Sequence, residues 1–256
     1  MTPAAGMSAI ASFFDDVSGK RNRIFTAHPV LAYEQYVRSR AVLESLAATA
    51  GETVLDVGCG NARDMLPILQ AGAGIVGVDL SAGMIQQARL ELAAAGYPDV
   101  ELEIGDATRL RFAAESFDKI LCSEVIEHIP NTDDAISEMY RVLKPGGRLI
   151  VSTPNRRSWY GFDRYVIWSR MLGKAWNHPF DNWRTMPELS ALLERHGFEV
   201  AGGRTICYVP GFLLTYFLPR ILQAAVVQCI RRVERPASRL AAHAGYLLVV
   251  TAVKRA

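Results

Sequence analysis

The feature that most constrains the fold is a glycine-rich turn placed between an apolar strand and a helical pattern. Residues 54–57 read Val-Leu-Asp-Val, residues 58–62 read Gly-Cys-Gly-Asn-Ala, and helical spacing of apolar side chains runs over 64–69. Glycines let the backbone turn sharply and approach a ligand, and the following helix start offers free N–H groups. In an open α/β sheet, ligands bind at such strand ends. The segment therefore predicts a binding site at the carboxyl end of a strand.

Short apolar runs alternate with helical patterns along most of the chain. Such a βαβα order predicts an α/β fold, in which helices cover both faces of a mostly parallel sheet. The length of 256 residues suits one large domain or two small ones. We expect strands at 54–57, 75–78, 100–104, 117–122, 148–152, 198–200 and 246–253, helices at 27–48, 64–69, 83–95, 133–143 and 187–196, and a turn at 144–147.

Charge and cysteine content narrow the class of protein. The chain has 28 Lys and Arg against 26 Asp and Glu, and this net charge of +2 argues against nucleic acid as its partner. The four cysteines form no Cys-x-x-Cys pair, and residues 1–14 lack the basic start and long apolar stretch of a signal peptide. Prolines, glycine and arginine interrupt the apolar stretch at 206–230, which argues against a transmembrane helix. We therefore expect a cytoplasmic protein with reduced thiols.

Two further acidic residues follow the second and third predicted strands. Asp79 can accept hydrogen bonds from ribose hydroxyls, and Asp106 can accept one from an adenine amino group. The alternative interpretation makes Asp79 a helix N-cap and Asp106 a turn residue. The dinucleotide fingerprint requires a glycine where Arg63 stands, and no Gly-Lys-Ser/Thr triplet of a phosphate loop is present. The pattern predicts a ligand that contains adenosine but lacks a pyrophosphate.

Five segments resemble the class I S-adenosylmethionine-dependent methyltransferases in order and spacing. They read VLDVGCGNA, GVDLS, GDATRL, SFDKILCSEVIEHIP and RVLKPGGRLIVSTPN, and they cover residues 50–155, with a looser likeness over 27–200. The resemblance implies a Rossmann-like, seven-stranded, mostly parallel sheet whose last strand is antiparallel, with a helical insertion before that strand. We expect a single methyltransferase domain over 1–256. Its parts are a helical cap (1–50), a cofactor-binding core (51–155), and an acceptor lid with the insertion and last strands (156–256).

The same resemblance assigns roles to residues of the core. It implies that Gly58 and Gly60 hold the methionine end of the cofactor, that Asp79 holds the ribose and that Asp106 holds the adenine. One departure is Ala62, which stands where the family has its third glycine, and we expect it to be tolerated. The cofactor-binding residues expected from the sequence are Arg38, Asp56, Gly58, Cys59, Gly60, Asp79, Leu80, Asp106, Ala107 and Ser123.

A Glu-x-x-Glu-His cluster follows the fourth predicted strand. Glu124, Glu127 and His128 are residue types that can ligate a divalent cation, and His128 can alternatively act as a general base with Glu124 beside it. The least specific interpretation leaves both glutamates solvated. The cluster resembles those of ubiquinone-biosynthesis O-methyltransferases and small-RNA 2′-O-methyltransferases, in which it is associated with a divalent cation near the acceptor hydroxyl. That resemblance implies Mg²⁺ held by these three residues and His178, with His128 and Glu124 as the catalytic alternatives.

Two segments after the core are expected to choose the acceptor. Residues 156–186 combine eight aromatic side chains with six basic ones, which suits an anionic or aromatic acceptor. Residues 209–240 combine an apolar helical pattern with a following arginine cluster. This second segment suits a lipid-like acceptor or peripheral contact with a membrane. A packed helical hairpin and a homodimer interface are alternatives left open.

Taken together, the residues predict a methyltransferase that acts on a hydroxyl of a small-molecule or lipid-like substrate. Two alternatives remain: an NAD-type oxidoreductase on the same architecture, and a non-catalytic cofactor-binding or membrane-associated scaffold. The Gly-x-Gly-x-Ala spacing argues against the oxidoreductase. The intact Glu-x-x-Glu-His cluster argues against the scaffold.

Overall fold

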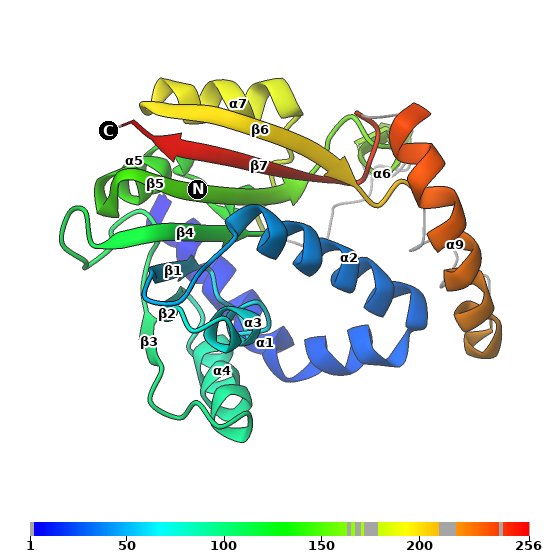
Figure 1. Ribbon diagram of the computed structural model, residues 1–256. Coiled ribbons are helices and arrows are strands. Elements are labelled where there is room, and N and C mark those ends of the chain that lie inside the picture. The colour runs from blue at the N-terminus through cyan, green and yellow to red at the C-terminus, as the bar shows by residue number, and fades with distance from the viewer. Residues whose placement is uncertain are drawn as a thin grey trace.

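A seven-stranded mixed sheet forms the centre of the molecule (Figure 1). The computed structural model describes residues 3–162, 165–166, 170–171, 179–209, 219–240 and 243–255. Strand order is β3-β2-β1-β4-β5-β7-β6; the first five strands pair in parallel, and β7 is antiparallel to both neighbours. The α/β fold expected from the sequence is confirmed. The strands are β1 (Thr53–Val57), β2 (Gly74–Asp79), β3 (Glu101–Ile104), β4 (Phe117–Ser123), β5 (Leu143–Pro154), β6 (Phe198–Ile206) and β7 (Leu247–Lys254).

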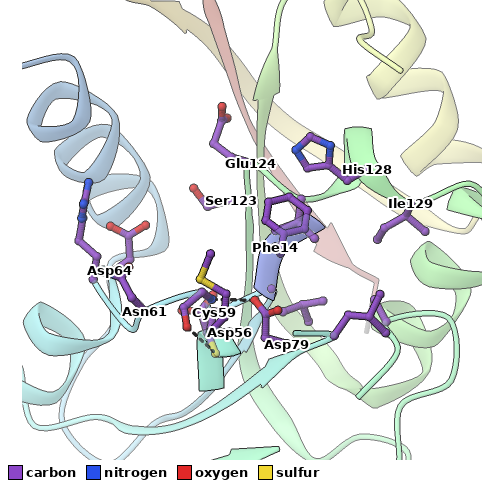
Figure 2. A pocket seen from close by; sticks show the side chains of 18 of the residues that line it. Phe14, Asp56, Cys59, Asn61, Asp64, Asp79, Ser123, Glu124, His128 and Ile129 are labelled. Atoms are coloured by element: carbon purple, nitrogen blue, oxygen red, sulfur yellow. Dashed lines mark hydrogen bonds between the residues drawn. The ribbon is translucent and has the colours of Figure 1, made fainter. Parts of the chain in front are cut away.

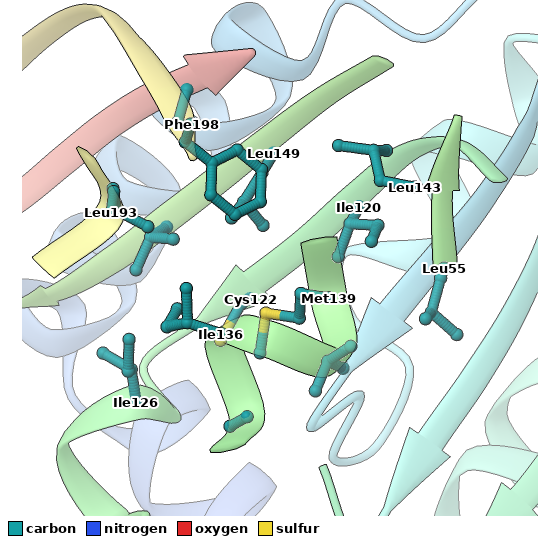
Figure 3. Close-up of a cluster of buried hydrophobic side chains, with 14 of the residues drawn as sticks. Leu55, Ile120, Cys122, Ile126, Ile136, Met139, Leu143, Leu149, Leu193 and Phe198 are labelled. Carbon is teal, nitrogen blue, oxygen red and sulfur yellow. The ribbon is translucent and has the colours of Figure 1, made fainter. Parts of the chain in front are cut away.

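Helices cover both faces of this sheet. One apolar core joins the sheet to α5 and α7, through side chains such as Ile136, Met139 and Leu193 (Figure 3). A second core on the opposite face joins the sheet to α2, α3 and α4. The helices are α1 (Pro3–Ala27), α2 (Pro29–Leu46), α3 (Met65–Gln70), α4 (Ala82–Ala94), the 3-10 turn η1 (Ile126–His128), α5 (Thr132–Val142), α6 (Trp159–Phe162), α7 (Met186–Arg195) and α9 (Arg220–Leu240).

The central strands form because their sequences are apolar on both sides. In β1, residues 54–57 are all buried, as parallel strands between two helical layers require. Val57 pairs with Val78 of β2 and with Cys122 of β4, so the carboxyl ends of these three strands lie level. The loops that follow them therefore meet at one edge of the sheet.

Two elements differ from the sequence prediction. Strand β6 runs on to Ile206, although a strand was expected only over 198–200, because pairing with β7 continues past the exposed Gly202 and Gly203. The expected turn at 144–147 lies inside β5 as an irregular segment. There Gly146 adopts φ +74°, and the pairing with β4 shifts register. In both places, pairing with a neighbouring strand keeps the chain extended where the sequence predicted the end of a strand or a turn.

Helix α1 is fastened to the start of α4. The Asp15 carboxylate accepts hydrogen bonds from the Ser81 hydroxyl and from the Gly83 backbone N–H, the latter at 2.8 Å. A carboxylate at this place satisfies free N–H groups and favours the positive end of the helix dipole. The contact holds the middle of α1 close to the sheet edge where the strand ends meet.

Helix α9 packs against α2 beyond the end of the sheet (Figure 1). Val227 and Ile230 of α9 cover Val30 of α2, whereas Ile221 is 86% exposed. Of the predicted 209–240 segment, residues 210–218 lie outside the described ranges. Within those ranges, we find no helix that combines the length and the apolar character needed for a membrane span.

Candidate active site

A cavity of about 450 Å³ lies where β1, β2 and β4 end. Figure 2 shows Asp56 and Asp79 on one side of it and Glu124 and His128 on the other. Helices α1 and α2 add further walls. The residues predicted from the sequence that line this cavity are Arg38, Asp56, Gly58, Cys59, Gly60, Asp79, Leu80, Ala107, Ser123, Glu124 and His128.

The glycine turn is fixed by hydrogen bonds to the neighbouring strand. The Gly58 and Cys59 N–H groups donate to the Val78 carbonyl at 2.7 and 3.0 Å. One oxygen of Asp79 accepts from the Gly60 N–H at 2.9 Å, and the other accepts from the Ser81 N–H at 2.9 Å. Asp79 thus joins the loop after β1 to the loop after β2, while it lines the cavity between them.

Ala62 keeps the backbone conformation that a glycine would favour. Its φ is +63°, in the left-handed region, and its side chain is fully buried beneath the turn. A left-handed alanine costs about 1 kcal/mol or slightly more. The surrounding packing outweighs this cost, so the departure from the family pattern leaves the turn intact.

Gly58 is the position in this turn where a side chain is excluded most strongly. Its φ is +72°, and a Cβ atom would lie 2.2 Å from Cγ2 of Val125. We expect Gly58→Ala to lower the free energy of unfolding by about 2 kcal/mol, because backbone strain and overpacking add. Chemical denaturation measures this change.

Gly60 provides the matched control for this variant. Its φ is +53°, but a Cβ there would meet nothing within 4 Å. We expect Gly60→Ala to cost only the backbone strain, about 1 kcal/mol. Adding Val125→Ala to Gly58→Ala should recover part of the loss. An equal cost at both glycines would contradict the steric account.

Buried charges surround the turn on the side of α2. Asp56 is 3% exposed, and burial raises its pKa well above the usual value, with Asp64 contributing further. Arg38 donates to Asp64 Oδ2 at 2.9 Å and also to the Ser123 hydroxyl. Burial alone would lower the pKa of Arg38, but Asp64 and Glu124 outweigh it and the pKa is raised. The guanidinium therefore stays charged at the cavity wall.

Glu124 is turned into the cavity by its backbone. Its φ is +59°, its N–H donates to the Ser152 carbonyl at 2.9 Å, and its Oε1 accepts from the Ser152 hydroxyl at 3.0 Å. Burial raises the pKa of Tyr246 well above its usual value, and the negative charge of Glu124 adds to this effect. Both residues line the cavity, together with Tyr160.

His128 lies between the cavity and Phe180, which belongs to the predicted acceptor segment 156–186. Its Nδ1 is 3.2 Å from the Phe180 carbonyl oxygen, and its Nε2 is 3.8 Å from a Glu127 oxygen. The Phe14 ring of α1 packs edge-on against the imidazole at 5.3 Å between centroids. A carbonyl can only accept, so Nδ1 carries the proton in this contact and Nε2 presents its lone pair.

Two predicted site residues, Glu127 and Asp106, are not part of the cavity wall. Glu127 is 2% exposed and accepts from the Thr153 hydroxyl at 2.9 Å, so its carboxylate is held beneath the wall. Asp106 Oδ1 accepts from the N–H and hydroxyl of Thr108 in its own turn. His178 lies outside the described residues. In the part of the chain that the structure describes, no three His, Cys, Asp or Glu side chains gather as a metal site requires.

Several cavity residues were not predicted from the sequence. Helix α1 contributes apolar side chains, α2 contributes Glu34 and Gln35, and Asp64 completes the Arg38 pair. The helical pattern at 27–48 and the family resemblance indicated a cap but could not say which face meets the cavity. The lining residues that were not predicted as site residues are Met7, Ile10, Phe14, Leu31, Glu34, Gln35, Val57, Asn61, Arg63, Asp64, Val78, Met84, Gly105, Val125, Ile129, Tyr160, Tyr246 and Leu247.

The donor and acceptor groups of this cavity fit S-adenosylmethionine. Two left-handed glycines leave room for close approach of a ligand to the backbone, and the Asp79 carboxylate stands beside them. Arg38 can pair with a carboxylate, and the buried Asp56 lines the cavity next to the turn. The other end of the cavity carries Glu124, His128 and two tyrosines, which can orient a polar aromatic molecule.

Comparison with known proteins agrees with this geometry. Residues 48–193 match the family model described as a methyltransferase domain. The chain is 30% identical over 215 residues to a demethylmenaquinone methyltransferase of Streptomyces avermitilis, covering 77% of this chain and 89% of that protein. It is also 30% identical over 210 residues to a ubiquinone biosynthesis O-methyltransferase of Xanthomonas euvesicatoria, covering 79% and 82%.

Solved structures show the same fold. The Burkholderia thailandensis 1,6-didemethyltoxoflavin-N1-methyltransferase, crystallised with S-adenosylhomocysteine, superposes with a TM-score of 0.63. The alignment covers all of this chain and 92% of that one, at 17% sequence identity. The likeness therefore concerns the fold, including the sheet edge at which the cavity lies.

Proposed function

This chain belongs to the S-adenosylmethionine-dependent methyltransferases, and we propose that it methylates a hydroxyl of a quinone-type or other lipid-like aromatic acceptor. The observation that carries the proposal is the placement of Glu124 and His128 on the cavity wall opposite Asp79. Those two side chains stand where an acceptor hydroxyl would face the methyl donor. The names of the two curated relatives support a quinone precursor as that acceptor.

The cofactor supplies the methyl group on an already activated sulfonium, so the protein contributes mainly positioning and proton removal. Gly58, Gly60 and Asp79 would hold it, with Arg38 at its carboxylate. His128 takes the proton of the acceptor hydroxyl at Nε2, since the Phe180 carbonyl fixes the proton on Nδ1. The imidazolium that forms is stabilised by negative charge, because carboxylate oxygens of Glu127 and Asp181 both lie 3.8 Å from its ring nitrogens.

Glu124 and the aromatic wall orient the acceptor. The Glu124 carboxylate accepts a hydrogen bond from a donor group of the acceptor, while Tyr160 and Tyr246 give it an aromatic surface. The two tyrosine rings lie 4.6 Å apart between centroids, and Tyr160 stacks on Trp183. Flat hydroxylated rings fit this wall better than flexible aliphatic acceptors.

Turnover on a panel of acceptors tests the proposal. Purified protein with methyl-labelled cofactor is given a hydroxylated prenyl-ring quinol, the same ring with its hydroxyls already methylated, and an aliphatic amine of similar size. We expect transfer to the first at least about tenfold faster than to the others, since each mispaired polar group costs more than 1 kcal/mol. Equal transfer to the amine would overturn hydroxyl specificity, and no turnover on any acceptor would favour the scaffold.

Adding EDTA to the same assay tests whether methyl transfer requires a metal ion. The described residues do not gather as a Mg²⁺ site, and no step of the proposal passes through a metal. We therefore expect equal rates with EDTA and with Mg²⁺. Loss of turnover in EDTA that Mg²⁺ restores would bring Glu127 and His178 back as ligands beside His128.

The enzyme would bind a lipid-like acceptor at a bilayer, and we propose that the outer face of α9 contacts the bilayer surface. Ile221, Leu222 and Val233 are exposed there, close in sequence to the exposed Arg232, whereas the Arg231 guanidinium lies over the Tyr33 ring of α2. An apolar face with an adjacent arginine favours an anionic membrane surface. The single acid of α9, Glu234, is turned inward and accepts from the backbone N–H groups of Tyr208 and Val209.

Co-sedimentation with phosphatidylglycerol vesicles measures this contact. We expect the double variant Ile221→Asp and Leu222→Asp to bind about tenfold more weakly, because apolar area is lost and negative charge is added. The matched control is Ile104→Asp, which changes an exposed apolar residue on β3, at the other edge of the sheet. Equal binding by both variants would remove α9 from the contact.

A further inference from the structure

A chain of hydrogen bonds runs from a buried cation to the Glu124 carboxylate. The Arg38 guanidinium donates to the Ser123 hydroxyl, and the Ser123 and Ser152 hydroxyl oxygens lie 2.9 Å apart. The Ser152 hydroxyl then lies 3.0 Å from Glu124 Oε1. Ser152 is completely buried, and its strand neighbour Ser123 is the last residue of β4.

The two ends of this chain fix the direction of every bond in it. A guanidinium can only donate, so Ser123 accepts from Arg38 and its own hydrogen is left for Ser152. The Ser152 hydroxyl donates its single hydrogen to Glu124 Oε1, so it accepts from Ser123. The ordered chain therefore fixes the position of Glu124 Oε1, because each hydroxyl in it has one donor and one acceptor partner.

Ser152 also holds the backbone of Glu124. Its carbonyl accepts the Glu124 N–H at 2.9 Å, at the residue whose φ is +59°. A non-glycine residue in this region is strained and persists only where its surroundings fix it. Ser152 of β5 thus fixes both the backbone conformation of Glu124 and the position of its carboxylate. The parallel pairing of β4 with β5 places Ser152 beside Ser123.

We propose that Ser152 is a positioning residue, which aims the Glu124 carboxylate at the acceptor through the hydroxyl chain that begins at Arg38. The proposal rests on the proposed function, since it gives Glu124 its part in hydroxyl methylation. Ser152 itself is not among the cavity-lining residues, so it acts through Glu124. The chain also links the cofactor side of the cavity, where Arg38 stands, to the acceptor side.

Two measurements on Ser152→Ala test this role. We expect kcat to fall about tenfold with little change in the affinity for S-adenosylhomocysteine, because one hydrogen bond to a charged group is lost. In protein labelled with ¹³C at glutamate carboxyls, we expect the Glu124 resonance, assigned with Glu124→Gln, to change its chemical shift at constant pH in the variant, because the carboxylate loses the hydroxyl that fixes it. Ser152→Thr, which keeps a hydroxyl, should restore both values.

Controls separate positioning from loss of structure. Ser45→Ala removes a serine hydroxyl that bonds within α2, and we expect it to change neither measurement. In a Glu124→Ala background, Ser152→Ala should cause no further loss of kcat. An unchanged Glu124 resonance in Ser152→Ala would overturn the inference, even if kcat fell. A changed Glu124 resonance in a protein that methylates no hydroxyl would overturn the proposed function and leave the positioning role standing.

Discussion

Replacing Asp79 by alanine is expected to weaken the binding of S-adenosylhomocysteine about 100-fold or more. The loss of two hydrogen bonds from ribose hydroxyls to a carboxylate accounts for about 3 kcal/mol or more. The same carboxylate joins the Gly60 and Ser81 N–H groups, so its removal also loosens the two loops that shape the cavity. Isothermal titration calorimetry measures the change in affinity.

Asp99→Ala is the matched control for that variant. Asp99 is an exposed acid in the loop before β3, outside the cavity. We expect its replacement to leave the affinity unchanged. Wild-type affinity in Asp79→Ala would mean that the ligand does not lie along the ends of β1 and β2.

Replacing His128 by alanine is expected to lower kcat about 100-fold or more, with little change in cofactor affinity. A general base contributes about 10²- to 10⁴-fold to such reactions. His128 lines the cavity, and its Nδ1 lies next to the Phe180 carbonyl. That carbonyl holds the proton on Nδ1 and so leaves the lone pair on Nε2. The variant also removes the ring against which Phe14 packs, so the thermal stability of each protein must be recorded alongside its rate.

His196→Ala is the control for the loss of an imidazole. His196 ends α7 and bonds to Asp133 at 2.8 Å, outside the cavity. We expect its kcat to equal that of the wild type. A kcat in His128→Ala within about threefold of wild type would assign proton removal elsewhere, since a base contributes far more than this.

The sequence was most informative where chemistry is local. The glycine turn, the acid that ends β2 and the Glu-x-x-Glu-His run all lie within segments whose spacing alone places them at strand ends. The seven-stranded sheet was implied by the family resemblance and is confirmed. These signals need no knowledge of distant contacts, because parallel strands always present their carboxyl ends at one edge.

The sequence was least informative where the position of a side chain depends on its contacts with residues outside the motif. Glu124 and Glu127 are equivalent in the motif, yet the left-handed backbone at Glu124 sends one into the cavity, and Thr153 holds the other beneath it. Asp106 likewise accepts from Thr108 within its own turn, a contact that the motif does not show. The local pattern also could not predict that Asp15 of α1 binds Ser81 and Gly83 at the start of α4, because these partners are 66 and 68 positions away in the sequence.

Titration of S-adenosylhomocysteine into the purified protein, with NAD as the control ligand, tests the central claim most directly. The account predicts one binding site of micromolar affinity for S-adenosylhomocysteine, no heat with NAD, and the same result with and without Mg²⁺. Binding of NAD with no response to S-adenosylhomocysteine would contradict it, because the glycine turn would then serve a dinucleotide.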